Sequence, residues 1–330
     1  MTPADGNKVR SAPTRSPGKR LRDLFTTDHG LLLPGVPNAL TALIAQDLGF
    51  DAVYLTGAGL TNTYLGLPDI GLISLPEIVA NTAAVADAVD LPLVVDADTG
   101  FGNAIAVART VRVLERAGAA GLQLEDQVAP KRCGHFDGQE VISAAEMVQK
   151  IHAAVDARSD ENSVIVARTD ARANHGLDAA LDRAAAYAAA GADVLFIEGL
   201  HSREELRAAG KCVPGIPKLA NMVEGGKTPL LSRDELVAMG FSIILYANAA
   251  MQGAIQGSQT VLRRLRDTGS LDAARDQLAP WEERQRLVRK ASYDEFVATL
   301  EGSEQDARVR LIMGLALGVM NLGFMAVLVY

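Results

Sequence analysis

The sequence predicts an α/β protein built as a single (β/α)₈ barrel. After residue 30, eight short apolar runs alternate with alanine-rich stretches of helical periodicity, as in repeated βα units that form a parallel sheet. Seven of the eight runs end in a polar or glycine-rich cluster. Barrel enzymes carry their functional groups at these carboxyl ends of the strands. The even spacing of the runs disfavours the alternative fold, an open doubly wound sheet.

The expected helices and strands follow from the positions of these apolar runs along the chain. Segments between the runs are expected to be helices: in AIAVARTVRVLERAG (104–118) and LDAALDRAAAYAAAG (177–191), apolar residues recur every three and four positions before a final glycine. The strand ends read YLTGAG, VVDADTGFG, LQLEDQ, VIVARTD, LFIEG, KLANM and LYAN. Strands are expected at 31–33, 52–55, 93–96, 121–125, 164–167, 194–198, 218–221 and 243–246.

Composition indicates a globular chain with two unusual ends. Of the 330 residues, 48% are hydrophobic and 22% charged, which leaves ample material for a core, and a net charge of −8 disfavours a nucleic-acid partner. Residues 1–22 carry a local charge of +5 and are expected to be a disordered basic tail, with no apolar region behind them that would make a secretory signal. The catalytic barrel with its C-terminal helices is expected at 23–300. Two cysteines, Cys133 and Cys212, fit a reducing compartment.

The last part of the chain, 301–330, is an apolar tail. Residues 311–330 are broken only by Asn321 and are long enough to cross about 30 Å of hydrocarbon as a helix. Arg308 and Arg310 before them would keep the catalytic domain on the cytoplasmic side. Other interpretations are an apolar helix packed in an oligomer and an extension without function. The expected location is the cytoplasm, with membrane association through 311–330 as one interpretation.

Carboxylates at the strand ends indicate a metal site. Asp96 and Asp98 are two positions apart and point the same way if the strand continues, Glu125 ends the next strand, and Asp69 follows the second. Four converging carboxylates repel one another, and a divalent cation is the simplest remedy. Oxygen ligands favour Mg²⁺, with Mn²⁺ as the alternative. Zinc is disfavoured because Cys133 has only one histidine near it in sequence.

A reactive cysteine follows the fourth strand. In EDQVAPKRCGH, Cys133 lies among Lys131, Arg132 and His135, and neighbouring cations favour the thiolate. Gly134 belongs to a flexible loop that could fold over a bound ligand.

A turn after the second strand could bind an anion. Thr56, Gly57 and Ala58 can present backbone N–H groups to an anionic oxygen.

Together these motifs resemble the isocitrate lyase and phosphoenolpyruvate mutase superfamily, in particular its methylisocitrate lyase and 2,3-dimethylmalate lyase branch. The resemblance covers roughly residues 22–300 and rests on YLTGAG with LGLPDIG, DADTGFG, EDQ followed by KRCGH, ARTDAR, FIEG and ANMVEGGKTP, in the family's order. It implies a (β/α)₈ barrel whose C-terminal helix is swapped between the subunits of a homodimer or homotetramer.

The resemblance also implies a role for each site residue. Cys133 would be the general acid, Arg168 would stabilise charge on the oxygen at C2, and Tyr54 is the candidate base for the C2 hydroxyl. His135 would join the catalytic set. Mg²⁺ would be held by Asp69, Asp96, Asp98 and Glu125. Substrate would be bound by Thr56, Gly57, Ala58, Lys131, Arg132, Gly134, Glu198 and Asn221.

The implied reaction is Mg²⁺-dependent cleavage of a 2-hydroxy di- or tricarboxylate, of the 2-methylisocitrate or 2,3-dimethylmalate type, to pyruvate and a second carboxylate. Alternatives are an oxaloacetate hydrolase or decarboxylase, a phosphonate mutase, and a non-catalytic, membrane-tethered metabolite-binding protein. The KRCGH cysteine favours carbon–carbon cleavage over phosphonate chemistry. Three departures from the family bear on substrate choice: Gln139 replaces a lysine, Thr56-Gly57-Ala58 replaces Ser-Gly-Gly, and FIEG replaces the FPEA of methylisocitrate lyases. The last of these departures favours dimethylmalate lyase.

Overall fold

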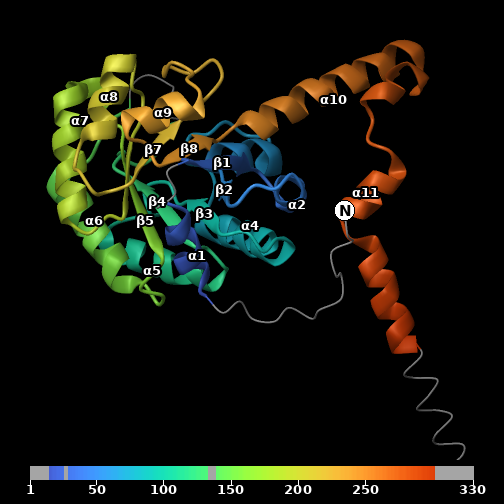
Figure 1. Cartoon of the computed structure of the whole chain (residues 1–330), viewed down its shortest axis with the longest axis horizontal. Coiled ribbons are helices and arrows are strands. Elements are labelled where there is room, and N and C mark those ends of the chain that lie inside the picture. The colour runs from blue at the N-terminus through green and yellow to red at the C-terminus, as the bar shows by residue number, and fades with distance from the viewer. Residues whose placement is uncertain (1–14, 26–28, 133–138, 302–330) are drawn as a thin grey trace, which may run out of the picture. The chain divides into compact units, whose positions relative to one another are not determined.

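The computed structural model describes residues 15–25, 29–132 and 139–301, and within them the chain forms a closed barrel of eight parallel strands (Figure 1). Each strand pairs with the next one in sequence, and β1 pairs with β8 to close the ring. The predicted (β/α)₈ fold is therefore confirmed. The strands are β1 Leu31–Val36, β2 Val53–Leu55, β3 Leu93–Asp96, β4 Gly121–Glu125, β5 Val164–Thr169, β6 Val194–Ile197, β7 Lys218–Asn221 and β8 Ile243–Tyr246.

Helices follow the strands around the outside of the barrel. The segments expected at 104–118 and 177–191 are helix α5 and most of helix α7. A π-helical turn, Thr61–Leu65, and a 3₁₀ segment, Asp272–Gln277, complete the described elements. The α-helices are α1 Pro17–Leu24, α2 Ala39–Asp47, α3 Gly57–Leu60, α4 Leu75–Ala88, α5 Ala104–Arg116, α6 Ala144–Ala157, α7 Arg172–Ala189, α8 Arg203–Lys211, α9 Arg233–Met239, α10 Ala249–Thr268 and α11 Trp281–Leu287.

The boundary expected for the basic tail differs from the structure. Residues 17–22, assigned to the tail, form most of helix α1. The Ser16 side chain accepts a hydrogen bond from the Lys19 backbone N–H at 3.2 Å, Pro17 occupies the first turn, and Leu21 is fully buried. The lysines and arginines of this segment made a short amphipathic helix resemble a charged, disordered tail in composition. The first fourteen residues lie outside the described part of the chain.

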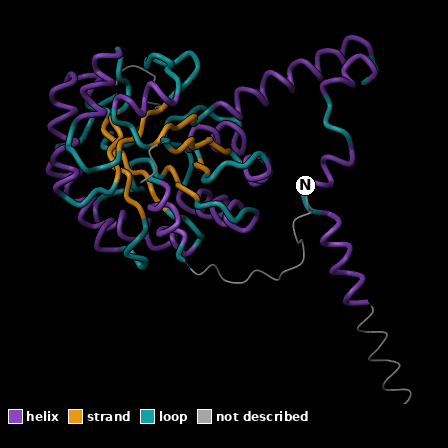
Figure 2. The backbone as a smooth tube through the Cα atoms, viewed as in Figure 1, coloured by secondary structure: helices purple, strands orange, loops and turns teal. Residues whose placement is uncertain are grey.

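The strands separate two apolar cores. One set of their side chains, joined by Leu21 of α1, fills the barrel interior, and the alternate set packs outward against the helices. Figure 2 shows the ring of strands enclosed by helices. At the carboxyl ends of the strands the inward-facing residues change from apolar to polar. Tyr54, Asp96, Gln123 and Arg168 lie there and form the walls of a cavity or its supports.

Helix α10 extends away from the barrel (Figure 1), and of its residues only Met251 is buried. Residues 279–301 belong to a separate compact unit that contains α11 and a helix over 290–301.

No helix in the described residues is long and apolar enough to cross a bilayer. The apolar stretch 311–330 lies outside those residues, so its membrane insertion stays a prediction from sequence.

Gly35→Ala is expected to lower the free energy of unfolding by about 3 kcal/mol, because overpacking against rigid backbone destabilises a core. A Cβ atom at Gly35 of β1 would lie 2.0 Å from the backbone oxygen of Ala247. Urea denaturation measures the change. Gly253→Ala on α10, where a Cβ would meet nothing within 4 Å, is the control and should not destabilise. Equal stability of the two variants would contradict the close approach of β1 to the end of β8.

Candidate active site

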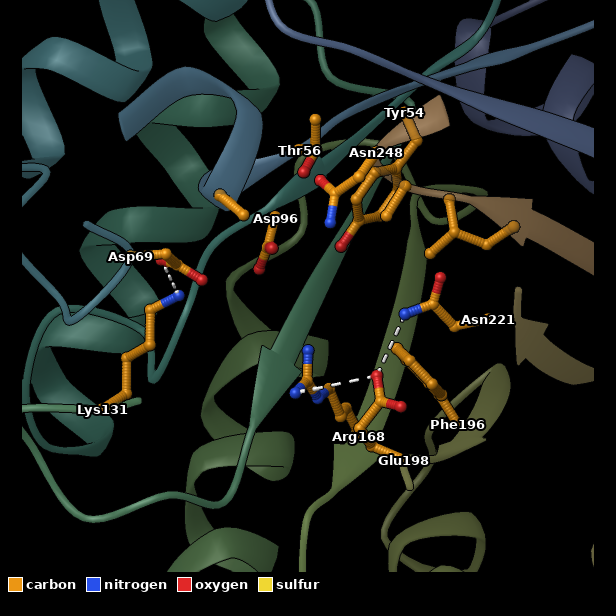
Figure 3. Close-up of a pocket in the computed structure, with 13 residues that line it drawn as sticks. Tyr54, Thr56, Asp69, Asp96, Lys131, Arg168, Phe196, Glu198, Asn221 and Asn248 are labelled. Atoms are coloured by element: carbon orange, nitrogen blue, oxygen red, sulfur yellow. Dashed lines mark hydrogen bonds and ion pairs between the residues drawn. The ribbon is translucent and has the colours of Figure 1, made fainter. Parts of the chain in front are cut away.

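A narrow cavity opens at the carboxyl ends of the strands (Figure 3). Its free volume is about 30 Å³, enough to hold a water molecule. Its walls are Tyr54, Thr56, Ala58, Asp69, Asp96, Lys131, Arg168, Phe196, Glu198, Asn221, Leu245, Ala247 and Asn248.

Most of the residues predicted for the site meet here. Of the sixteen, nine line the cavity, and Gly57, Asp98 and Glu125 contact those that do. Arg132 does not line the cavity: its side chain is exposed, and its backbone N–H donates to Gln127 Oε1 at 2.8 Å. Cys133, Gly134 and His135 lie outside the described residues, so their roles stay predictions.

Two aspartates lie side by side at the end of β3. A Cβ atom at Gly57 would lie 3.0 Å from Asp96 Oδ2 and 3.2 Å from Asp98 Oδ1. A side chain at this position, two residues after β2, would press closely on both carboxylates. Asp98 itself has φ of 48°, the left-handed region, which turns the chain sharply after the strand. Both carboxylates are buried.

Lys131 lies among these acids. Its ammonium forms ion pairs with Asp69 and with Asp98 Oδ1, the latter at 3.0 Å (Figure 3 draws the first). Burial alone would lower the pKa of Lys131, but Asp98, Glu125 and Asp69 hold it well above its usual value. Among the described residues, no three Asp, Glu, His or Cys side chains converge closely enough to hold a metal ion. The predicted four-carboxylate metal set is therefore not assembled in this arrangement.

One buried carboxylate oxygen is nevertheless without a partner. Glu125 Oε1 accepts a hydrogen bond from no described residue, whereas Asp98 Oδ1 has the Lys131 ammonium at 3.0 Å. Burial raises the pKa of Asp98 to about 6 although Lys131 opposes the shift, and burial raises that of Glu125 well above its ordinary value although Arg168 opposes it. Buried oxygens without donors are what a hard cation relieves. The donor set therefore fits Mg²⁺ or Mn²⁺.

Arg168 is held as a rigid, charged plane at the end of β5. Its Nε and Nη2 donate to the two oxygens of Asp170 at 2.9 and 2.8 Å, and its guanidinium lies 5.2 Å from the centre of the Phe196 ring. Nη1 is 3.4 Å from Glu125 Oε2, and Nη2 is 3.8 Å from Glu198 Oε2. Burial works against the charge, but Asp170 and Glu125 hold the pKa of Arg168 well above its usual value.

Asn221 and Glu198 form the opposite wall. Asn221 Nδ2 donates to Glu198 Oε2 at 3.1 Å, and Glu198 Oε1 accepts from the Gly199 backbone N–H at 2.8 Å. Asn221 Oδ1 is buried and bonded to no described residue. This wall therefore offers an unused acceptor to a bound ligand.

Tyr54 reaches the cavity from β2. Its hydroxyl donates to Gln123 Oε1 at 2.7 Å, and Gln123 Nε2 donates to Asp96 Oδ1 at 3.0 Å. Burial, and next the charge of Asp96, raise the pKa of Tyr54 well above 10. Its predicted role as the base stays a prediction.

Several residues that shape the site were not predicted. Gln123 and Asp170 have a readable signal, since each lies two positions from a predicted site residue on the same strand or its end and so faces the same way. Asn248 is the last residue of the LYAN cluster. Nothing in the sequence marks Phe196, Leu245 and Ala247 as site residues, because an apolar residue of a strand can face either the barrel interior or the outer helices.

Comparisons with known proteins identify the family. A family model described as phosphoenolpyruvate phosphomutase matches residues 21–266. The chain is 46% identical over 264 residues to 2,3-dimethylmalate lyase of Eubacterium barkeri, covering 80% of this chain and 91% of that protein. It is 43% identical over 298 residues to 2-methylisocitrate lyase of Aeropyrum pernix, covering 90% and 96%.

Solved structures give the same result. A crystal structure of 2,3-dimethylmalate lyase matches with a TM-score of 0.82 and 36% identity, covering 87% of this chain and 96% of that one. A crystal structure of phosphonopyruvate hydrolase in complex with oxalate and Mg²⁺ matches with a TM-score of 0.77 and 30% identity, covering 87% and 99%. The resemblance seen in the motifs is confirmed, and the chain belongs to the phosphoenolpyruvate mutase and isocitrate lyase superfamily.

Proposed function

We propose that this protein is a Mg²⁺-dependent carbon–carbon lyase that cleaves the C2–C3 bond of a 2-hydroxy di- or tricarboxylate into pyruvate and a second carboxylate. One observation carries the proposal: Arg168 and the carboxylates of Asp69, Asp96 and Glu198 line one cavity at the carboxyl ends of the strands. The buried carboxylates of Asp98 and Glu125 form ion pairs with Lys131 and Arg168 of the same cavity. Relatives at 46% and 43% identity are named for cleavage of 2,3-dimethylmalate and 2-methylisocitrate.

The metal would be held by Asp69, Asp96, Asp98 and Glu125, directly or through water. Bound there, it would supply positive charge against the oxygen at C2 and the neighbouring carboxylate of the substrate. The buried Glu125 Oε1, which no described residue satisfies, supports this assignment, as does the Mg²⁺ complex of the related hydrolase. For Asp69 and Asp98 to take part, Lys131 has to leave its present ion pairs.

We assign substrate binding, stabilisation of charge and proton transfer to residues of the chain itself. The backbone N–H groups of the turn from Thr56 to Ala58 bind the carboxylate of the pyruvyl half. Arg168, held by Asp170, directs Nη1 at the developing charge on the oxygen at C2. A base, for which Tyr54 is the predicted candidate, would take the proton of the C2 hydroxyl. As that oxygen becomes a carbonyl, the C2–C3 electron pair passes to the leaving fragment. Cys133, which sequence resemblance alone identifies as the general acid, protonates that carbanion.

The remaining predicted contacts belong to the same proposal. Glu198 and Asn221 line the far wall of the cavity. Lys131, Arg132, Gly134 and His135 come from the KRCGH segment, and their substrate contacts rest on the resemblance.

The test is pyruvate release from 2-methylisocitrate and from 2,3-dimethylmalate, followed with lactate dehydrogenase, with and without Mg²⁺ and for Cys133→Ser. We expect pyruvate that requires both the metal and Cys133, and the better substrate identifies the branch. No pyruvate from either acid would refute the proposal. Oxalate and acetate from oxaloacetate would then favour a hydrolase, a rearranged C–P compound a mutase, and metal-dependent binding without product a non-catalytic protein.

The full-length protein is expected to be a homodimer or homotetramer in which α10 covers a partner's barrel. The exposed side chains of α10 include Ile255, Leu262 and Leu265, and the outer face of β1 and β8 carries a groove. Sedimentation velocity should give at least twice the chain mass of 34.8 kDa for wild type and a smaller species for Leu262→Asp. A wild-type monomer would contradict the swap. The groove is lined by Leu32, Pro34, Phe50, Ser232, Arg233, Asp234, Tyr246 and Ala249.

A further inference from the structure

The turn after β3, residues 97–102, has an uncommon backbone conformation. Asp98 and Phe101 have φ of 48° and 60°, in the left-handed region, which is rare for residues other than glycine and rarer still for a bulky side chain. Gly100 and Gly102 also have positive φ, of 87° and 144°. A strained backbone of this kind persists only where the surrounding structure over-determines it. The turn therefore needs support from other parts of the fold.

Two helices outside the turn supply hydrogen bonds to it. The carbonyl of Thr99 accepts from the ammonium of Lys150 on α6 at 3.0 Å, and the carbonyl of Gly100 accepts from the hydroxyl of Thr110 on α5 at 3.1 Å. These two helices pack against each other beside β3 and β4 (Figure 1). Two successive carbonyl groups of the turn are thus each held by a side chain from a different helix.

Thr110 does not make the hydrogen bond that its own helix offers. A buried threonine within a helix commonly donates to the carbonyl four residues earlier. Thr82 of α4 is fully buried and does this, with its hydroxyl 2.7 Å from the Ile78 carbonyl. Thr110 is equally buried, but its hydroxyl donates to Gly100, ten residues earlier and outside the helix. Its hydrogen bond is therefore a tertiary contact with the turn.

Lys150 is also directed at the turn. Its side chain is buried, and within the part of the chain that the structure describes its ammonium pairs with no carboxylate. Burying an ammonium group costs free energy unless it is hydrogen-bonded. A methionine of similar length would fill the same space without that cost. What the lysine adds at this position is the hydrogen bond to the Thr99 carbonyl.

The turn connects three of the carboxylate residues at the strand ends. The carbonyl of Asp98 accepts from the Glu125 backbone N–H at 2.9 Å, and the Asp98 N–H donates to Asp96 Oδ1 at 3.2 Å. A change in the conformation of the turn would therefore move the Asp98 carboxylate relative to the other two.

We propose that Thr110 and Lys150 are positioning residues that hold this turn in its left-handed conformation and thereby fix the Asp98 carboxylate for a divalent cation. That Asp98 binds the cation rests on the proposed function. Neither side chain lines the cavity, so each acts through the backbone of the turn and not by contact with the cation or the substrate. Loss of a residue that orients metal ligands in this way typically weakens metal binding by about ten- to a hundredfold.

The test is the Kd of Mn²⁺ for the full-length protein without substrate, measured by electron paramagnetic resonance of the free ion. Thr110→Val keeps the shape of the side chain and removes the hydroxyl, and Lys150→Met keeps the length and removes the ammonium. Each variant should raise the Kd about tenfold. Thr110→Ser keeps the donor, so its Kd should stay within about threefold of the wild-type value.

Thr82→Val is the matched control. It too removes the hydroxyl of a fully buried threonine, but the hydrogen bond that is lost lies within one helix. Whatever this substitution costs in melting temperature, it should leave the Kd of Mn²⁺ unchanged. The comparison separates an effect on the turn from a general loss of stability.

The outcomes separate this inference from the proposed function. A Kd within about twofold of wild type in Thr110→Val or in Lys150→Met would overturn the role of that residue, and an equal rise in Thr82→Val would overturn both. If Lys150→Met fails to fold, Thr110→Val and Thr110→Ser decide the matter. A wild-type protein that binds no Mn²⁺ would refute the inference together with the metal site. Because binding is measured without turnover, the expected Kd values in a protein that releases no pyruvate would refute the lyase and not this inference.

Discussion

Arg168→Lys is expected to lower kcat/KM for the cleaved 2-hydroxy acid by about a hundredfold to a thousandfold, the usual effect of losing one preorganised donor to a developing oxyanion. Lysine keeps the positive charge, so Glu125 and Glu198 are not left without a nearby cation. It cannot keep the paired hydrogen bonds that Nε and Nη2 donate to Asp170 at 2.9 and 2.8 Å. The charge would therefore no longer be held in the plane beside Phe196, where Nη1 faces the site.

Steady-state kinetics of pyruvate release measure this effect. Arg183→Lys is the matched control, since Arg183 is an arginine of α7 that pairs with buried Asp126 at 3.0 Å without lining the cavity. We expect kcat/KM of the control to stay within a few-fold of wild type. Equal losses in the two variants, accompanied by equal losses in melting temperature, would mean that Arg168 serves only the fold.

The fold could be predicted because its signal is local and repeated. Four strands, β3, β4, β7 and β8, begin and end where the apolar runs do. β1 continues through Pro34 to Val36, beyond its run, because its register with β2 and β8 adds hydrogen-bonded neighbours that the sequence does not display. Helix α1 was missed for the opposite reason: its composition is basic, and the burial of Leu21 in the barrel, which stabilises the helix beside its Ser16 cap, does not show in the composition.

The site was predicted to the extent that it follows from strand ends. Asp96 and Glu125 end β3 and β4, Arg168 is next to the last residue of β5, and the parallel barrel brings all strand ends to one face. Lys131 was expected to contact substrate, and its ion pairs with Asp69 and Asp98 depend on loop paths that have no periodicity in the sequence.

For Gln123, the sequence predicts which way the side chain points but not which groups it contacts. Alternation in LQLE places its side chain on the same face as Glu125, inside the barrel. Its orientation between a carboxylate and a phenol, however, depends on three strands at once, because Tyr54, Asp96 and Gln123 come from β2, β3 and β4.

Removal of divalent metal is expected to abolish pyruvate release and to lower the melting temperature. Metal that binds the folded state at a hundred times its Kd stabilises it by about 2.7 kcal/mol, which corresponds to a shift of roughly 5 °C or more for a chain of this size. The reason lies in Glu125 Oε1, a buried oxygen that accepts no hydrogen bond from the described residues and that a bound cation would satisfy. Calorimetric melting after EDTA treatment, with and without added Mg²⁺ or Mn²⁺, measures the shift.

Glu125→Gln separates the metal from other sources of stability. The amide removes the charge of a buried carboxylate whose pKa is raised by burial, so the metal-free variant should be at least as stable as metal-free wild type. Its gain on adding Mg²⁺ should be smaller, because one ligand is weaker. If Mg²⁺ raises the melting temperature of both proteins equally, Glu125 is not a ligand. If it raises neither, and the EDTA-treated enzyme still releases pyruvate, Lys131 and Arg168 supply all the positive charge that the reaction needs, and the carboxylates at the strand ends serve to hold these two cations.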